Sequence, residues 1–509
     1  MARQPDILIL MADQLTPGAL PAWGNTVART PHIDRLAAEG VVFDAAYCNS
    51  PLCAPSRAVL MTGMLPSASG VYDNAADFSP QLPTWAHHLR LAGYRTVLAG
   101  KMHFCGPDQL HGFEERLTTD IYPADYGWTP DWTRPLERAE WFHSMSSVTE
   151  AGPCVRTNQV DFDEEVSFVA RRRLFDLARQ RAAGVEGAEA PFCMVVSLTH
   201  PHDPFVIPQE YWNRYDDAAI DMPRVPAEHV PDPHSARLRH INAIDATPVT
   251  QAQIRAARHA YYGACSFVDD HVGAMLETLR ETGLDRDTIV LLLADHGEML
   301  GERGLWYKMS FFEPSCRIPL IVHAPARFAP HRVSQAVSSA DILPTLAALG
   351  GAPVPPETPI EGRSLVPHLE GTGGHDEVFA EYLAEGAVAP IVMIRRERWK
   401  FVHCPADPDQ LYDLAADPDE LHNLADDPAQ AARVAALRQE VAARWDLPAL
   451  DAAVLASQAR RHIVNTALRR GAATSWDHQP RRDASREYIR SHMDLEMLEA
   501  MARFPRQGT

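Results

Sequence analysis

The sequence predicts an α/β protein in which helices cover both faces of a mixed, mostly parallel sheet. The first observation is that short apolar runs alternate with helical patterns along most of the chain, as they do in proteins with a parallel sheet. The second is size, because the chain has 509 residues, of which 46% are hydrophobic. A chain of this length usually buries one large core and a smaller second one.

Apolar runs followed by polar residues mark the predicted strands. We expect strands at residues 7–11, 96–99, 194–198, 289–293 and 319–322, and helices at 33–39, 85–92 and 268–280. Close behind four of these strands stand Asp13 and Gln14, Lys101 and His103, His200 and His202, and Asp295 and His296. Ligands bind at the carboxyl ends of the strands in open α/β sheets, so these residues are expected to converge on one pocket.

The chain divides into three predicted regions. Residues 1–374 are expected to form the catalytic α/β domain. The composition loosens at 371–374, and apolar runs at 378–382, 391–394 and 399–402 predict a small antiparallel sheet in a subdomain spanning 375–450. Residues 451–509 are expected to form a helical arm for oligomerisation, with a Trp-containing segment at 476–480 and a Met-rich acidic segment at 493–501.

Charge and cysteine content limit the partners and the compartment. The chain has 47 basic and 67 acidic residues, a formal net charge of -20, which argues against nucleic acid and anionic membranes as partners. No stretch reaches the roughly 20 apolar residues that cross a bilayer, and the apolar run from Asp6 to Asp13 is too short for a signal peptide. Eight cysteines without a CxxC pair fit reduced thiols and a cytoplasmic protein.

The strongest local motif is Cys53-Ala54-Pro55-Ser56-Arg57. Taken alone, the motif fits a functional site no better than it fits a small buried cysteine that precedes a proline turn and a helix starting at Ser56. The motif resembles the C-x-P-x-R sequence of the formylglycine-dependent sulfatases, members of the alkaline phosphatase superfamily. The resemblance implies an alkaline-phosphatase-like fold and the oxidation of Cys53 to formylglycine by a separate maturation enzyme. A hydrated aldehyde offers two hydroxyls on one carbon, one to attack sulfur and one to expel sulfate from a sulfo-enzyme intermediate.

Two further motifs resemble the metal ligands of the same superfamily. They supply Asp13 with Gln14 and Asp295 with His296, and the resemblance adds the modified Cys53 as a fifth ligand. Oxygen donors with one imidazole suit Ca2+, with Mn2+ or Mg2+ as alternatives. Taken singly, aspartates at strand ends more often cap turns than bind metals.

Several cations and histidines complete the predicted chemistry. Gly100-Lys101-Met102-His103 resembles the G-K-x-H element that places a lysine on the sulfate and a histidine beside the formylglycine. Arg57 and Lys308 would add positive charge, which stabilises charge that develops in the transition state. Lys308 could instead be a solvated surface lysine. His202 is the expected proton donor to the leaving oxygen, with His200 as the alternative or as a structural partner.

Longer stretches resemble the bacterial choline sulfatases, among them 50–55, 71–76, 106–122, 124–130, 301–306 and 476–480. The resemblance implies that Asn74 contacts the sulfated end of the substrate and that Trp128, His143 and Glu385 bind choline. A trimethylammonium group has no N–H, so aromatic faces and a carboxylate suit it. The alternatives are that Trp128 is an apolar anchor and Glu385 a solvated loop acid.

The same resemblance implies a homotetramer whose C-terminal arm reaches a neighbouring site. The arm reads His492-Met493-Asp494-Leu495-Glu496, with glutamate where aspartate is expected. This departure leaves open whether Asp494 or Glu496 reaches a neighbouring subunit.

The predicted function is hydrolysis of choline O-sulfate to choline and sulfate by S–O cleavage. The first alternative is a promiscuous phosphonate monoester or phosphate diester hydrolase, or another alkyl or aryl sulfatase, because related enzymes share the nucleophile and most cations. The second is a catalytically silent choline-binding protein whose Cys53 is never oxidised.

Overall fold

The computed structural model describes residues 4–122, 125–356 and 358–471. The predicted segments at 476–480 and 493–501, and the arm residues Asp494 and Glu496, lie outside these residues. Within the described part, no helix is both long and apolar enough to cross a membrane.

The main sheet carries the predicted mixed, mostly parallel architecture. Its strand order is β11-β2-β10-β8-β1-β6-β3-β4, and β9 pairs with β2. The central pairs β8/β1, β1/β6 and β6/β3 are parallel, whereas β10 runs antiparallel to β8 and β2. The strands are β1 (Asp6–Ala12), β2 (Val41–Tyr47), β3 (Arg95–Gly100), β4 (Glu115–Arg116), β6 (Phe192–Leu198), β8 (Thr288–Ala294), β9 (Arg317–Ile318), β10 (Leu320–His323) and β11 (His331–Ser338).

The five predicted strands are confirmed as β1, β3, β6, β8 and β10. In β1, β6 and β8 every residue is buried. A strand with helices over both of its faces reads as a continuous apolar run rather than an alternating one. The sequence DILILMA of β1 therefore identifies a central strand.

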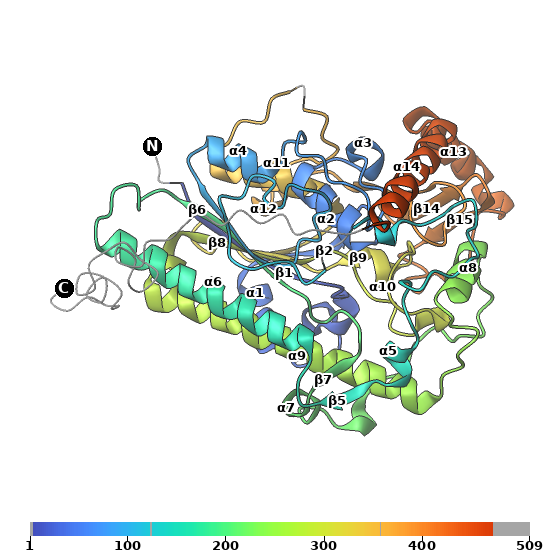
Figure 1. Ribbon diagram of the computed structural model, residues 1–509, viewed down its shortest axis with the longest axis horizontal. Helices are drawn as coiled ribbons and strands as arrows, with labels where there is room; N and C mark the ends of the chain where they lie inside the picture. The colour runs from blue at the N-terminus through green and yellow to red at the C-terminus, as the bar shows by residue number, and fades with distance from the viewer. Residues whose placement is uncertain (1–3, 123–124, 357, 472–509) are drawn as a thin grey trace.

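Helices cover both faces of this sheet (Figure 1). One face is covered by α1 (Pro31–Glu39), α6 (Asn158–Ala182) and α9 (Gln251–Thr282), and the other by α2 (Cys53–Thr62), α4 (Trp85–Leu91), α11 (Ile342–Gly350) and α12 (Val366–Leu369). The helix predicted at 268–280 is the second half of the longer α9. Thr250 and Gln253 form a capping box at its start, and Gly283 ends it with a φ of 68°.

A second, antiparallel sheet follows with strand order β12-β13-β14-β15. Its strands are β12 (Glu377–Tyr382), β13 (Ile391–Arg396), β14 (Trp399–Cys404) and β15 (Asp407–Asp413). The first three confirm the predicted runs, and β15 is an addition whose Asp-Pro start resembles a turn. Helix α13 (Ala431–Arg444) contributes Val434, Leu437 and Val441 to a small separate core with this sheet.

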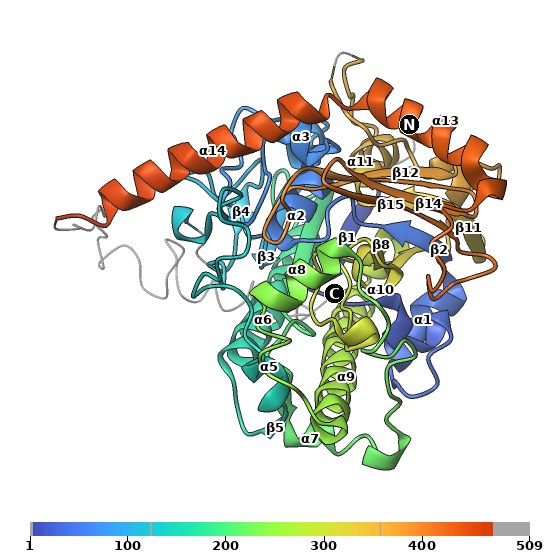
Figure 2. The same cartoon turned by 90° about the vertical axis from the view of Figure 1, so that its right-hand side faces the viewer.

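Helix α14 (Leu447–Leu468) begins a few residues before the expected arm and crosses the molecule above α2 and the short α3 (Pro66–Ser69) (Figure 2). The remaining α-helices and strands are short. They are α5 (Ser146–Thr149), α7 (Gln209–Trp212), α8 (Pro233–Ile241), α10 (Glu313–Cys316), β5 (Gly152–Cys154) and β7 (Val206–Pro208).

Candidate functional site

Four neighbouring strands end side by side and bring the predicted residues together. Ala12 of β1 is level with Leu198 of β6 and with Ala294 of β8, and Gly100 of β3 is level with Ser197. The chain turns sharply after two of these ends, where Gln14 and His103 have φ values of 63° and 56°. Positive φ is uncommon for residues other than glycine.

Cys53 is the first residue of α2, so the expectation that this helix starts at Ser56 is wrong. Pro55 does not prevent the earlier start, because the first four N–H groups of a helix have no acceptor within the helix and proline lacks only one of them. Cys53 therefore lies at a helix N-terminus, where the helix dipole favours negative charge.

The Cys53 thiol is 2% exposed and surrounded by positive groups. Its Sγ lies 3.2 Å from His296 Nε2 and 3.7 Å from Lys101 Nζ. Burial alone would raise the pKa of the Cys53 thiol, but Lys101, Lys308 and His296 outweigh it and place this pKa well below its usual value. Thiolate character marks reactive cysteines.

Donor atoms of Asp13, Cys53, Asp295 and His296 all lie within 4.8 Å of one another and are buried. Asp13 Oδ1 has no hydrogen-bond partner among the described residues, an orphaned buried acceptor that a cation would satisfy. Two carboxylates and one imidazole fit a hard divalent ion. This quartet contains four of the five predicted metal ligands.

Gln14, the fifth predicted ligand, lies beside the quartet with its side-chain amide engaged elsewhere. Its Oε1 accepts a hydrogen bond from Lys308 Nζ at 2.7 Å. Its Nε2 donates to Asp203 Oδ1 at 3.4 Å and to Glu298. Oε1 retains a second lone pair, so its role as a ligand stays a prediction.

Arg57, four residues after Cys53, binds the two carboxylates of the quartet. Its guanidinium donates to Asp295 Oδ2 at 2.8 Å, to Asp13 Oδ2 at 3.2 Å and to Ser197 Oγ at 3.0 Å. Lys101 forms an ion pair with Asp13. The Arg57 donors are thus used by protein acceptors, and Arg57 does not line the cavity beside Cys53 as described. Direct contact of Arg57 with sulfate stays a prediction.

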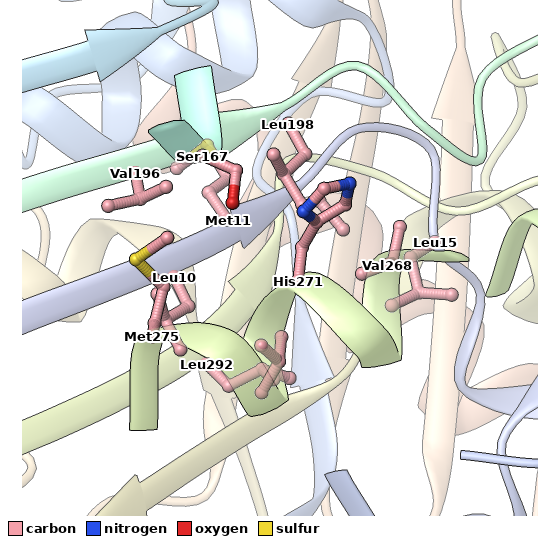
Figure 3. Close-up of a pocket in the computed structure, with 12 residues that line it drawn as sticks. Leu10, Met11, Leu15, Ser167, Val196, Leu198, Val268, His271, Met275 and Leu292 are labelled. Carbon is pink, nitrogen blue, oxygen red and sulfur yellow. The ribbon is translucent and has the colours of Figure 1, made fainter. Parts of the chain in front are cut away.

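A cavity of about 260 Å³ opens beside Cys53. Eight of the predicted residues line it, namely Cys53, Asn74, His103, Trp128, His143, His202, Lys308 and Glu385. A smaller apolar cavity of about 10 Å³ lies between β1, β6 and α9 (Figure 3). Its lining of Leu, Val and Met side chains with Ser167 and His271 contains none of the predicted residues, so we assign it to the core.

The contacts of His200 fit the alternative in which it is a structural partner. Its Nδ1 lies 2.7 Å from Asp163 Oδ2, its ring packs on Phe267 at 4.7 Å, and it does not line the cavity. His202 does line it, with Nε2 2.9 Å from Lys308 Nζ. The proposed substrate contact of His200 stays a prediction.

Part of the cavity wall is aromatic and acidic. The rings of Trp128 and His103 are 5.6 Å apart, and His143 stacks on Tyr307 at 4.1 Å. Burial, with a smaller effect of Asp73, raises the pKa of Glu385 to about 7. Burial likewise lowers the pKa of His143 to about 4, although its partner Asp203 opposes this.

The wall also contains several residues that the sequence did not predict. They are Tyr122, Trp141, Phe142, Asp203, Pro204 and Asn242. Asp203 stands directly beside His202 in the sequence, and that adjacency was an available signal. Asp203 joins the site through Ser147 Oγ at 2.9 Å and His143 Nδ1 at 3.4 Å.

Comparison with known proteins adds to this geometry. Residues 5–352 match the family model described as Sulfatase, and 452–504 match the model described as Choline sulfatase enzyme C terminal. The chain is 47% identical to a choline-sulfatase of Rhizobium meliloti, over 99% of each chain. It is 30% identical to the uncharacterized sulfatase YidJ of Escherichia coli, over 81% of each.

Solved structures agree on the fold. A phosphonate monoester hydrolase of Agrobacterium radiobacter is 25% identical with a TM-score of 0.67, covering 90% of this chain and 96% of that one. A phosphonate monoester hydrolase of Silicibacter pomeroyi is 24% identical with a TM-score of 0.68, covering 87% and 95%. The two domain matches and the full-length relative show that the chain belongs to the sulfatase family of sulfuric ester hydrolases and carries the C-terminal domain found in choline sulfatases.

Proposed function

We propose that the protein hydrolyses choline O-sulfate to choline and sulfate by S–O cleavage. The observation that carries this proposal is that one cavity is lined by the buried nucleophile Cys53, by aromatic rings and by Glu385. Glu385 Oε2 has no hydrogen-bond partner in the described residues. This is expected of a carboxylate that binds a trimethylammonium group, which has no N–H to donate. The full-length similarity to a protein named choline-sulfatase supports the same substrate.

Cys53 is proposed to act after its oxidation to formylglycine by a separate maturation enzyme. The hydrated aldehyde supplies two hydroxyls on one carbon, so that one forms the bond to sulfur and the other later expels sulfate. In the unmodified chain the thiol Sγ stands where one of these oxygens would stand. Lys101 and His296 already surround that position.

A divalent cation, for which we propose Ca2+ with Mn2+ or Mg2+ as alternatives, fits Asp13, Asp295 and His296, with the modified Cys53 and Gln14 completing its shell. When bound, it would polarise the nucleophile and the ester oxygen. Arg57 holds both carboxylates in place through the contacts at 2.8 and 3.2 Å. We propose that this arrangement keeps the site formed before the ion binds.

The remaining predicted site residues are proposed to orient the substrate and move protons. Lys101 and Lys308 would face the sulfate oxygens, whose charge grows toward the leaving oxygen in the transition state. His202 would protonate the choline oxygen as the S–O bond breaks, and His103 would take the proton from the second hydroxyl. Asn74 would contact the sulfated end, and Trp128, His143 and Glu385 the trimethylammonium group.

A phosphonate monoester hydrolase is the second candidate, favoured by the structural similarity at a TM-score of 0.67. The ratio of kcat/KM on choline sulfate and on an aryl phosphonate monoester separates the two. We expect the ratio to favour choline sulfate strongly, since an aryl phosphonate offers no cation to Glu385. A silent choline-binding protein would bind choline without releasing sulfate even when it contains formylglycine.

The decisive experiment pairs mass spectrometry of the peptide that contains Cys53 with sulfate release from choline sulfate. Formylglycine together with rapid release supports both nucleophile and substrate. Formylglycine without release contradicts choline sulfate as the substrate. An unmodified cysteine calls for co-expression with a formylglycine-generating enzyme before the assay is repeated.

We also propose the three regions 1–374, 375–450 and 451–509, supported by the separate core under β12–β15. A homotetramer is proposed in which the arm serves oligomerisation. Exposed apolar residues on α14 support it, since Ile463 is 71% and Leu468 is 73% exposed. Eight free cysteines in the described chain support a reducing compartment, for which we propose the cytoplasm.

A further inference from the structure

Helix α14 packs against the two loops that carry Asn74 and Trp128. Residues 454, 458, 461 and 462 lie on one face of the helix, as their spacing of three and four residues requires. On this face Gln458 is 3% and Arg461 is 6% exposed. Buried polar side chains are costly unless they are paired, so their partners identify what the helix holds in place.

Arg461 pairs with Asp73, the residue before Asn74. Its Nη1 and Nη2 donate to Asp73 Oδ1 and Oδ2 at 2.6 and 2.7 Å. The Asp73 side chain is fully buried and also accepts from Ala75 N at 3.0 Å, so it fixes the turn around Asn74. A two-point contact of this kind defines orientation as well as distance.

The Asn74 loop connects this pair to the nucleophile. Asn74 lines the cavity, and its Oδ1 accepts a hydrogen bond at 2.9 Å from Ala54 N, the residue after Cys53. Arg461 itself is absent from the described lining of the cavity. Any effect of Arg461 on the substrate is therefore transmitted through Asp73 and Asn74.

The same face of α14 holds the loop of Trp128. Arg461 Nη1 donates to Thr129 Oγ1 at 3.2 Å, and Gln458 Oε1 accepts from Trp132 N at 2.9 Å. His462 Nε2 lies 3.1 Å from the carbonyl oxygen of Pro130. The loops of Asn74 and Trp128, both of which line the cavity, are thus attached to one helix face, and Arg461 contacts both loops.

We propose that Arg461 is a positioning residue that holds Asn74 and Trp128 in register, so that helix α14 determines which alcohol the sulfatase pocket accepts. The inference rests on the proposed function and names a residue outside the pocket as a determinant of its specificity. The C-terminal domain would then be part of each subunit's own site, in addition to any role between subunits.

The test compares three variants with the wild type. Arg461→Met removes both hydrogen bonds to Asp73, and Arg461→Lys keeps the charge without the planar fork. The matched control is Arg181→Met, because Arg181 makes an equivalent two-point pair with Asp6 at 2.6 and 2.7 Å at the opposite end of β1. The measurements are thermal unfolding, the Kd for choline alone, and kcat/KM on choline sulfate and on p-nitrophenyl sulfate.

For Arg461→Met we expect choline affinity and kcat/KM on choline sulfate to fall by about 10- to 100-fold, the order expected when binding groups move by about 1 Å. We expect kcat/KM on p-nitrophenyl sulfate to fall less, by about 10-fold at most, because this ester has no ammonium group and is affected only through Asn74 at the sulfate end. Arg461→Lys should fall between, and Arg181→Met should retain the substrate ratio of the wild type whatever its stability.

An unchanged substrate ratio in both Arg461 variants would overturn the inference, as would an equal change in Arg181→Met. If Arg461→Met does not fold, Arg461→Lys alone decides. The wild-type protein tests the proposed function separately. Should it hydrolyse another sulfate ester and not choline sulfate, the same ratio is measured with that ester, and the two statements succeed or fail independently.

Discussion

Lys308 Nζ lies 2.9 Å from His202 Nε2 on the wall of the pocket. His202 Nδ1 lies 2.7 Å from the carbonyl oxygen of Asp203, which can only accept. The Nδ1 atom therefore carries the proton of the imidazole, and Nε2 accepts from the Lys308 ammonium. A proton that passes from the Lys308 ammonium to Nε2 would make His202 the donor to the leaving alcohol oxygen.

The fall in kcat caused by removing His202 should depend on the leaving group. For His202→Ala we expect kcat on choline sulfate to fall by about 100-fold or more, within the usual range of general acid catalysis. With p-nitrophenyl sulfate the loss should be about 10-fold or less, because p-nitrophenolate leaves without a proton. The control is His200→Asn, outside the pocket, which should affect both esters alike. Equal losses for His202→Ala would rule out proton donation.

Cys53→Ala should abolish sulfate release while the protein remains folded. The nucleophile is lost outright, so the expected residual kcat is below about 10⁻³ of the wild type. Cys48→Ala, another buried cysteine that precedes the same helix, is the matched control and should retain activity. The circular dichroism spectra of both variants should match the wild type. Turnover by formylglycine-free Cys53→Ala would contradict the assigned nucleophile.

Choline sulfate binding should depend on pH through Glu385. The pKa of this carboxyl is raised by burial to about 7, so it is neutral below that pH and carries its charge above it. Only the charged form attracts the ammonium, and KM should therefore rise as pH falls from about 8 to 6. Glu385→Gln should show a KM about 10-fold higher and independent of pH in this range. The same profile with p-nitrophenyl sulfate reports any pH effect on the nucleophile.

Glu385 also predicts the sign of a stability effect. A carboxyl whose pKa is raised in the folded state binds its proton more tightly there than in the unfolded chain. Its contribution to the free energy of unfolding is thus fully present below the unfolded value near 4.5 and is lost as pH rises through about 7. Choline should offset that loss, so its stabilising effect on Tm should be larger at pH 8 than at pH 6. A larger effect at pH 6 would contradict the assignment.

Removal of the cation should abolish turnover and lower Tm. Chelator-treated protein should regain thermal stability on titration with Ca2+, because an ion that binds only the native state stabilises it. Asp13→Asn should weaken this response by about 10-fold in metal concentration. Asp270→Asn, in a separate carboxylate group with His32 and Asp269, should leave it unchanged. An undiminished response in Asp13→Asn would place the ion elsewhere.

The central sheet and the first layer of the site were predictable for one physical reason. A strand buried on both faces is an unbroken apolar run, and the first polar residue after it, such as Asp13 or Asp295, must lie at the edge where ligands bind. Tyr122, Trp141 and Asn242 gave no such signal, because they belong to irregular segments whose path is fixed by tertiary contacts. Arg461 was equally hidden, since its partner Asp73 is 388 residues away.

Helix α2 also constrains the order of events during biosynthesis. All ten of its residues are buried, including the whole segment from Cys53 to Arg57 that a maturation enzyme would need to grip. We therefore expect oxidation and folding to compete in time, with the nascent chain as the only accessible substrate. A molecule that folds α2 before Cys53 is oxidised can no longer be modified. The fraction of active protein in a preparation should therefore depend on the rate of folding relative to the rate of oxidation.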